Sequence, residues 1–142
     1  MMESDEEKPY IFVIGGNEDD HRSHRECEMY DVISDKWSPI ASMIQARTRT
    51  GAVVCSKRIY VTGGEDWAID DYFSSAEIYD PFKETWKLAG NLKNLRSSHG
   101  TAVLNGSVYV AGGYDGQCML ICLSLFKHYV IPIGHLCSWT NS

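Results

Sequence analysis

The sequence predicts an all-β protein made of repeated four-stranded antiparallel sheets. A strand-like segment that ends in Gly-Gly occurs three times, at residues 11–16, 59–64 and 108–113. Short runs of β-branched and aromatic residues, bounded by glycine and asparagine, are typical of strands. With 142 residues, the chain is long enough for one ordinary domain with a moderate core.

The spacing of further landmarks shows that the unit is a true repeat. Pairs of identical residues lie 49 positions apart, namely Tyr30 and Tyr79, Trp37 and Trp86, and Arg47 and Arg96. The glycine pairs, at similar spacing, are Gly15-Gly16, Gly63-Gly64 and Gly112-Gly113. The interval from the glycines to the tyrosine alone differs by one residue between units, which predicts a loop there and packed structure elsewhere.

Each expected strand follows from this alignment. The first sheet begins at residue 10 with the strand that ends in Gly-Gly, followed by strands at 27–31 and 36–40, where Pro39 fits an outer edge. The second sheet is complete, with strands at 49–55, 58–62, 76–80 and 85–88. The third has strands at 99–104 and 107–110, joined by Asn105-Gly106, the preferred type I′ hairpin turn. Ser56-Lys57 occupies the equivalent turn in the second sheet.

The landmark residues have physical roles in such an array. Glycine allows the chain to leave a strand sharply, close to another backbone. The tyrosines and tryptophans can fill the seams between neighbouring sheets. Glu28 and Glu77 lie two residues before each tyrosine, while Arg47 and Arg96 lie just ahead of a first strand. We expect these acids and arginines to pair and to join adjacent sheets.

A period near 50 with Gly-Gly, Tyr and Trp at these positions resembles the kelch repeat, in which each unit is one blade of a β-propeller. The resemblance covers residues 10–116 and implies an incomplete kelch-type propeller of about two and a half blades. In that family the arginine ahead of the first strand is structural. Because propellers close with about 4 to 8 blades, we expect open blade edges that favour instability or self-association.

The two ends differ from the repeat. Residues 1–9 are acidic without an apolar signal segment and are expected to be disordered. Residues 117–142 form a divergent apolar tail, because the expected Glu-x-Tyr-Asp and tryptophan are missing. Its apolar run at 118–126 is too short to cross a bilayer. A buried strand, a sticky tail and an out-of-family terminus are the alternatives, and the last is favoured.

Strand topology predicts which face binds a partner. In antiparallel blades, the long loops after the second and fourth strands share one face, and function concentrates on such loops. The resemblance points to the residues before the first strands and after the glycines, and exposed aromatic residues suit a recognition surface. The candidate partner-binding residues are Arg49, Ser98, Asn17, Glu65, Trp67, Tyr72 and Tyr114. The alternatives are that Arg49 is merely solvated and that Trp67 folds back on its own blade.

Composition and motifs disfavour other functions. A net charge of −6 does not suit a nucleic-acid binder, and five cysteines without a secretory signal suggest reduced thiols in the cytoplasm. No cofactor, metal site or membrane partner is expected. His21, His24 and Cys27 are possible zinc ligands, but they lie among charges in a loop that is expected to be solvated. A second set matches no familiar structural zinc spacing, namely Cys118, Cys122, His128, His135 and Cys137. Paired acids such as Asp70-Asp71 are expected in turns rather than in catalysis.

The predicted function is therefore that of a non-enzymatic protein-interaction module that binds a peptide or loop segment. Kelch-like proteins often present substrates to a cullin ubiquitin ligase, which would make this chain the recognition half of an adaptor. The alternatives are an actin or cytoskeleton-binding kelch protein and, less favoured, an enzyme on a kelch propeller.

Overall fold

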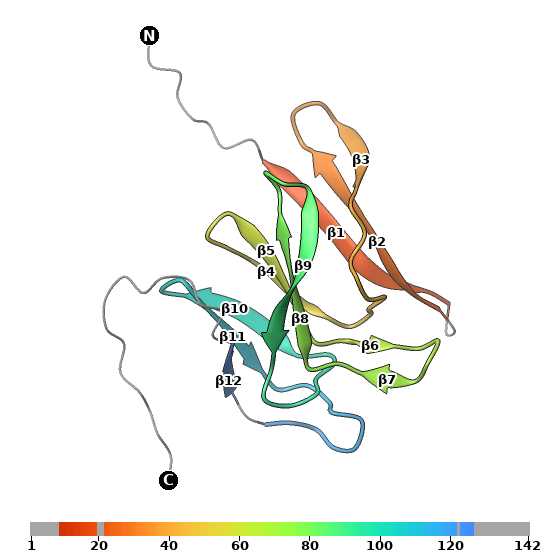
Figure 1. Ribbon diagram of the computed structural model, residues 1–142, viewed down its shortest axis with the longest axis vertical. Helices are drawn as coiled ribbons and strands as arrows, with labels where there is room; N and C mark the ends of the chain where they lie inside the picture. Colours follow the sequence, from red (N-terminus) through yellow and green to blue (C-terminus); the bar gives the residue numbers. More distant parts are fainter. Residues whose placement is uncertain (1–8, 20–21, 122, 127–142) are drawn as a thin grey trace.

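A computed structural model describes residues 9–19, 22–121 and 123–126, and all regular elements within them are β-strands (Figure 1). No helix in these ranges is long and apolar enough to cross a membrane. The strands form three successive antiparallel sheets, which we name blades 1 to 3. The prediction of an all-β fold built of successive antiparallel blades, as in an incomplete propeller, is confirmed.

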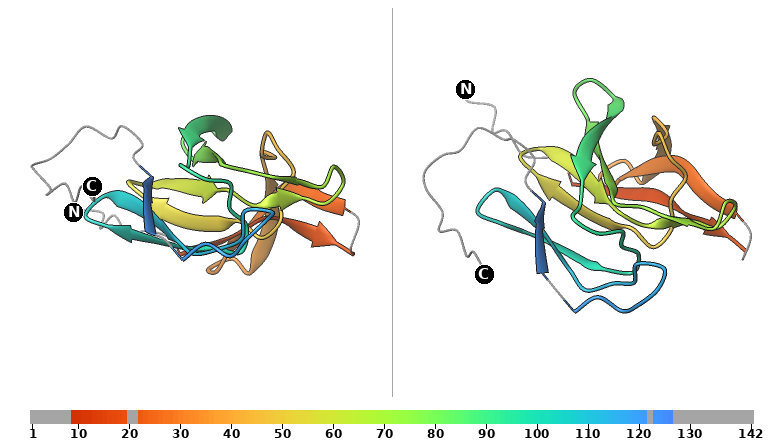
Figure 2. Two further views of the ribbon diagram at one scale, coloured as in Figure 1. Left: turned by 90° about the horizontal axis from the view of Figure 1, so that it is seen from below. Right: turned by 60° about the horizontal axis from the view of Figure 1, so that its bottom comes forward.

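Each blade follows the predicted strand order. Blade 1 contains β1 (Tyr10–Glu18), β2 (Arg22–Asp31) and β3 (Lys36–Ile40) in that spatial order. Blade 2 has the order β4 (Gly51–Cys55), β5 (Arg58–Thr62), β8 (Ser75–Asp80) and β9 (Thr85–Asn91). Blade 3 consists of β10 (Gly100–Leu104), β11 (Ser107–Ala111) and β12 (Leu123–Phe126). In both views of Figure 2 the blades follow one another in chain order, with blade 2 in the middle.

The repeat extends to the pairing register. Tyr30 faces Ile11 on β1 and Trp37 on β3, and its ring centroid lies 5.0 Å from that of Trp37. Tyr79 faces Ile59 on β5 and Trp86 on β9, with a Tyr79–Trp86 centroid distance of 5.1 Å. Equivalent landmarks therefore occupy equivalent places in the two blades.

Two apolar clusters hold the blades together. Between blades 1 and 2, buried side chains pack with partly buried neighbours from both sheets, namely Cys27, Met43, Ile59, Val61 and Tyr79 with Phe12, Ile14, Ile40 and Trp86. Between blades 2 and 3 the cluster contains Cys55, Tyr60, Ala76, Ile78, Ala89, Leu92, Val108 and Val110. Since both clusters lie between sheets, most of the core is a set of interfaces between blades.

The predicted seam role of the aromatic landmarks holds for blade 2. Tyr79 is buried and its ring lies 6.5 Å from that of Phe12 in blade 1. The Trp86 indole N–H donates to the carbonyl of Ala41, at 2.7 Å, in the segment that connects the blades. Each ring therefore contributes apolar surface, and Trp86 adds one polar contact across the seam.

Two long loops contain more pairing than the sequence indicated. The expected loop at 17–26 belongs largely to a hairpin, because β1 continues to Glu18 and β2 starts at Arg22 after a register shift between Ile14 and Gly16. In the loop at 65–75, β6 (Glu65–Asp66) pairs with β7 (Asp71–Tyr72) as a two-stranded ribbon. Backbone polar groups that leave a blade thus continue to pair with each other, which stiffens both loops.

Blade 3 has a third strand although its side chains lack the landmark residues. β12 pairs antiparallel with β11, with Val108 opposite Phe126. A strand was one alternative for the segment 117–142, but Leu123 is 66% exposed, so its side chain is not buried. Residues 127–142 lie outside the described residues, as do residues 1–8.

Candidate protein-binding face

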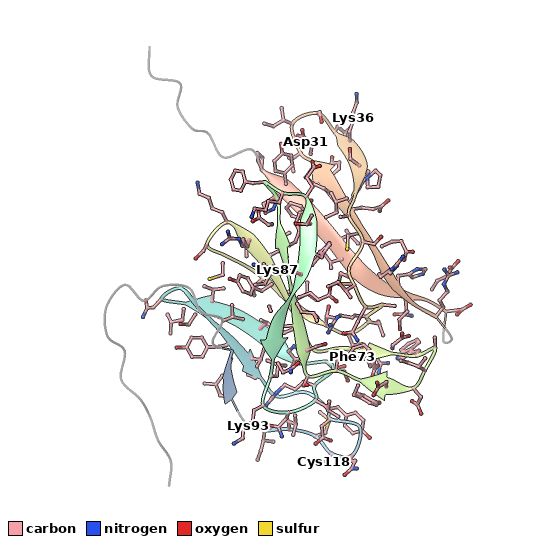
Figure 3. The ribbon with its side chains drawn as sticks, viewed as in Figure 1. Asp31, Lys36, Phe73, Lys87, Lys93 and Cys118 are labelled. Atoms are coloured by element: carbon pink, nitrogen blue, oxygen red, sulfur yellow. The ribbon has the colours of Figure 1, made fainter. Side chains whose placement is uncertain are left out.

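The long loops gather at one end of the blades, which we name the loop face. The β6–β7 ribbon, the far end of the β1–β2 hairpin and the loop after β11 lie together there in Figure 1. In Figure 3, Phe73 and Cys118 mark this end, while Asp31 and Lys36 mark the short β2–β3 turn at the opposite end. This separation is the one that antiparallel topology predicts.

Isolated bridges attach these loops to the segments that enter each blade. Thr48 bridges to Glu65 and Ser97 bridges to Tyr114, each through a reciprocal pair of backbone hydrogen bonds of 2.8–3.0 Å. The Thr48 hydroxyl also donates to the side-chain carbonyl of Asn17 at 3.0 Å. These contacts fix Asn17, Thr48 and Glu65 as one group and Ser97 and Tyr114 as a second group.

Arg49 and Ser98 occupy equivalent positions with the same unusual backbone. Their φ angles are 52° and 53°, in the left-handed region, and the Ser98 amide donates to the carbonyl of Arg49 at 2.9 Å. Non-glycine residues in this region are uncommon and are often found at functional sites. The geometry links the two predicted binding positions directly through the backbone.

The Arg49 side chain is held by neighbours from its own chain. Its guanidinium lies 2.9 Å from the Glu65 carboxylate and 5.0 Å from the centre of the Trp67 ring. Glu65 is buried and also accepts a 2.7 Å hydrogen bond from the Trp67 indole N–H. Trp67 thus folds back over Arg49 and is only partly exposed, as one of the sequence alternatives stated.

Two tyrosines form the next part of the surface. The rings of Tyr72 and Tyr114 meet edge to face with centroids 5.7 Å apart. Gly116 allows this contact, because a Cβ atom there would lie 3.1 Å from the Tyr72 ring. Partial burial and then the nearby negative charge of Glu65 raise the pKa of Tyr72, so its hydroxyl stays neutral and can both donate and accept.

A pocket of about 400 Å³ opens among these side chains. Four of its lining side chains are carboxylates and one is a guanidinium that already contacts Glu65. The lining residues are Arg49, Glu65, Asp66, Trp67, Asp70, Asp71 and Tyr72. The pocket therefore combines aromatic walls with a net negative charge.

Sequence reasoning did not anticipate some of the residues that position this pocket. The backbone N–H of Trp67 donates to the Ser23 hydroxyl at 3.0 Å, across the boundary between blades 1 and 2. Asp66 accepts a 3.0 Å hydrogen bond from the amide of Ala68 and thereby shapes the turn of the ribbon. The Asp66–Ala68 turn has a local signal, but no pattern in the sequence links Ser23 to Trp67.

The predicted arginine–glutamate pairing is present in blade 2. The Nε atom of Arg47 lies 3.2 Å from a Glu77 carboxylate oxygen, and both side chains are fully buried. The same carboxylate accepts backbone hydrogen bonds from Ile44 at 2.7 Å and Gln45 at 3.1 Å, in the segment that arrives from blade 1. Arg96 is also buried and donates to the carbonyl of Gly112 at 2.6 Å. These contacts join adjacent blades.

Within residues 9–19, 22–121 and 123–126, no group of three His, Cys, Asp or Glu side chains is placed to hold a metal ion. His24 and Cys27 of the first candidate set lie in these ranges, with Cys27 buried. His21 and, from the second set, Cys122, His128, His135 and Cys137 lie outside them.

Comparison with known proteins shows that the chain belongs to the kelch-repeat family. The Kelch motif matches residues 8–44, 46–93 and 95–124, so the matched units correspond to the three blades. Kelch repeats form protein-interaction modules, and that is the general class of this chain.

Similar curated proteins are kelch-like proteins of several animals. Kelch-like protein 13 of Mus musculus is 46% identical over 41 residues, which are 29% of this chain and 6% of that protein. Kelch repeat-containing protein kel-10 of Caenorhabditis elegans is 39% identical over 59 residues, or 42% of this chain and 10% of the relative. Kelch-like protein 36 of Rattus norvegicus is 35% identical over 63 residues, or 40% and 10%. The matched part is thus a tenth or less of these relatives.

Proposed function

We propose that this chain recognises a protein partner through the loop face and that an extended peptide or loop of the partner enters the pocket beside Trp67 and Tyr72. The observation that carries this proposal is a pocket of about 400 Å³ at the loop face, formed where the β6–β7 ribbon meets Arg49 in the segment that enters blade 2. Aromatic side chains on fixed loops supply contact area at a low cost in conformational entropy. No catalytic role is proposed.

The charge of the pocket favours a partner segment with a basic side chain. Glu65 already neutralises Arg49, while Asp66, Asp70 and Asp71 also line the pocket. An acidic segment that approached Arg49 would meet these carboxylates, and like charges placed together disfavour a complex. The recognised segment is therefore expected to be neutral or positively charged.

Affinity capture tests the proposal if it is compared between matched variants. Tyr72→Ala removes an aromatic wall of the pocket, while Phe82→Ala removes a ring that is 82% exposed, from a turn on the opposite face. We expect captured partners to be depleted at least tenfold with the Tyr72 variant, a typical loss for a hot-spot aromatic residue. Equal recovery by both variants would show that the loop face is not the binding surface.

The resemblance to kelch-like proteins supports the role of recognition half of a cullin ubiquitin-ligase adaptor, acting in the cytoplasm. Binding of actin or another cytoskeletal protein is the second candidate. Cosedimentation with purified actin filaments separates the two: cosedimentation that Tyr72→Ala abolishes supports the cytoskeletal role, and its absence together with capture of ligase clients supports the adaptor role. A metal-dependent enzyme is the less favoured alternative, and elemental analysis of the purified chain would detect its metal. Self-association through open blade edges remains a prediction.

A further inference from the structure

The turn between β10 and β11 consists of Asn105 and Gly106, and both residues are exposed. Their φ angles are 50° and 71°, as a type I′ turn requires. Leu104 and Ser107 pair across the turn, so the two residues between them lie outside the ladder. The tip of this hairpin points away from the β6–β7 ribbon in Figure 1. Solvent therefore reaches the peptide bond that joins Asn105 to Gly106.

The backbone nitrogen of Gly106 is accessible. Among the described residues, no backbone or side-chain acceptor takes its N–H. A Cβ atom at Gly106 would meet nothing within 4 Å, so neighbouring groups do not cover this side of the turn. Glycine has no side chain of its own to shield the nitrogen. The side-chain amide of Asn105, which no described residue hydrogen-bonds, is able to turn toward this nitrogen.

The other described asparagines are exposed as Asn105 is, but their surroundings differ. The Asn17 side chain is fixed, because its carbonyl oxygen accepts a 3.0 Å hydrogen bond from the Thr48 hydroxyl and its amide group donates to a backbone carbonyl at 3.0 Å. After Asn91, the N–H of Leu92 donates to a backbone carbonyl at 2.7 Å. In each of these places a hydrogen bond holds a group that is unrestrained in the β10–β11 turn.

Two further positions show what the glycine and the open turn each contribute. Asn94 is exposed but precedes Leu95, whose side chain branches from the carbon next to the backbone nitrogen. Asp115 does precede a glycine, Gly116, but its carboxylate accepts hydrogen bonds of 2.9 Å and 2.8 Å from two backbone amides of its own loop. Of the described asparagines, Asn105 alone combines a following glycine with an unrestrained side chain.

We propose that Asn105 is a site of spontaneous modification, at which the folded chain converts asparagine into aspartate and isoaspartate. The Gly106 nitrogen attacks Asn105 Cγ: the N–Cγ bond forms, the Cγ–Nδ2 bond breaks, and ammonia leaves with the proton of the Gly106 N–H. Water then hydrolyses the cyclic imide. Opening at Cγ gives aspartate, and opening at the backbone carbonyl carbon gives isoaspartate, whose main chain continues through Cγ. Water is the co-reactant, and no group is oxidised or reduced.

The isoaspartate product alters the boundary between blades 2 and 3. It adds a methylene carbon to the main chain of a two-residue turn, and the turn fixes the register of its hairpin. Val108, which follows the turn, is buried in the apolar cluster between blades 2 and 3. The Gly106 carbonyl accepts a 3.5 Å contact from the Cys55 thiol of blade 2. The modification therefore loosens blade 3, and it does so independently of the loop face.

Incubation of the purified full chain at mildly alkaline pH tests the proposal. Fragmentation by mass spectrometry locates each asparagine that has exchanged its amide NH2 for OH, and isoaspartyl methyltransferase detects the isoaspartate product. We expect Asn105 to be converted first, at a rate that rises with hydroxide concentration because the attacking nitrogen must lose its proton. Asn17, Asn91 and Asn94 are internal controls and should be retained over the same period. The chain unfolded in urea is the positive control for the chemistry.

Gly106→Lys is the matched variant, because Ser56-Lys57 forms the equivalent turn in blade 2 with φ angles of 52° and 58°. It keeps Asn105 but places a side chain beside the attacking nitrogen, so the rate of conversion should fall at least severalfold. Retention of Asn105 in the folded chain would overturn the proposal. So would equal rates of conversion for Gly106→Lys and the unmodified chain, or for Asn105 and Asn94.

Hydrogen exchange tests the consequence for blade 3. The converted chain should lose protection of the β10 and β11 amides, whereas Asn105→Asp, which has the same charge and an ordinary main chain, should keep it. Equal protection in the two samples would overturn the claim that isoaspartate loosens the blade.

Discussion

At the residue scale, Arg47 shows how a buried charge can join two blades. Burial lowers the pKa of its guanidinium, and the adjacent charge of Glu77 raises it again. The guanidinium also binds two backbone carbonyls and lies 4.9 Å from the centre of the Phe73 ring. Taking both charges out of water is costly, but the complete set of hydrogen bonds offsets that cost. The pair is therefore sensitive to the loss of either partner.

Glu77→Gln should destabilise the fold by about 3 kcal/mol, because it leaves the buried Arg47 guanidinium without its counter-charge. Urea denaturation followed by tryptophan fluorescence measures this free energy of unfolding. Glu28→Gln is the control at the same repeat position and should change stability by less than about 0.5 kcal/mol, as exposed substitutions do. An unchanged midpoint for Glu77→Gln would show that the pair contributes nothing to the fold.

His99 gives the boundary between blades 2 and 3 a dependence on pH. Burial, and then the positive charge of Arg96, lower the pKa of His99 from 6.5 to about 4. Its Nε2 atom lies 2.9 Å from the Thr62 hydroxyl. The unfolded chain binds a proton between these two pKa values and the folded chain does not, so stability falls as the pH drops through this window.

Between pH 7 and pH 5, His99 alone should lower the free energy of unfolding by about 2 kcal/mol. Denaturation curves at the two pH values measure the loss, and His99→Gln should reduce it by that amount. His24→Gln serves as the comparison, because His24 is only half-buried, beside two carboxylates. If His99→Gln kept the full pH dependence, the neutral histidine would not be its source.

At the element scale, the strands and turns of blade 2 could be predicted from sequence because two signals agreed. β5 has the predicted bounds, and the Ser56-Lys57 and Asn105-Gly106 turns both have positive φ angles. The ribbon of β6 and β7 could not be predicted, since strands of two residues have no periodicity. The strand β12 could not be predicted from the repeat either, because it forms by backbone pairing with β11 and lacks the Glu and Tyr landmarks.

The candidate site could be predicted only in part from the sequence. Topology predicted only the face on which the long loops lie. The family resemblance pointed to the residues before the first strands and after the glycines, and the aromatic residues of the loop at 65–75 supplied Trp67 and Tyr72. The Arg49–Glu65 ion pair and the position of Trp67 were not predictable, because they depend on how the loops pack against each other in space. The aromatic and acidic residues of the loop at 65–75 pointed to a recognition surface, while the structure added that Glu65, Asp66, Asp70 and Asp71 line one pocket.

The glycine pairs allow each strand to leave its blade against the segment that enters the next. Gly63 has φ +58°, and a Cβ atom there would lie 2.3 Å from the Arg96 carbonyl oxygen. Gly106 in the β10–β11 turn also has positive φ, but a Cβ atom there would meet nothing within 4 Å. An alanine at either position would have a strained positive φ angle. Only the alanine at position 63 would also clash with the backbone of Arg96.

Gly106→Ala should therefore cost about 1 kcal/mol of stability and Gly63→Ala at least about 2 kcal/mol more. Thermal denaturation of the two variants side by side provides the comparison. Similar losses for both would mean that strand β5 does not pass close to the segment that enters blade 3.

At the scale of the whole molecule, stability depends on contacts between blades as much as on the strands within each. Both apolar clusters lie at blade boundaries, and the buried ion pair joins the crossing segment to the third strand of blade 2. The same arrangement leaves the outer face of blade 1 apolar and exposed, with Ile11, Val13 and Trp37 each about half accessible. The repeat thus accounts for the cohesion of the array.

Nuclear Overhauser contacts in the labelled full chain test most directly whether the repeat units stack as consecutive blades. The account predicts contacts within each blade, between Ile11 and Tyr30 and between Ile59 and Tyr79. It also predicts contacts across the boundary, between the Phe12 and Tyr79 rings, whose centroids are 6.5 Å apart. Contacts within the blades without the Phe12–Tyr79 contacts would contradict it, because the strands would then form without the stacking that defines a propeller.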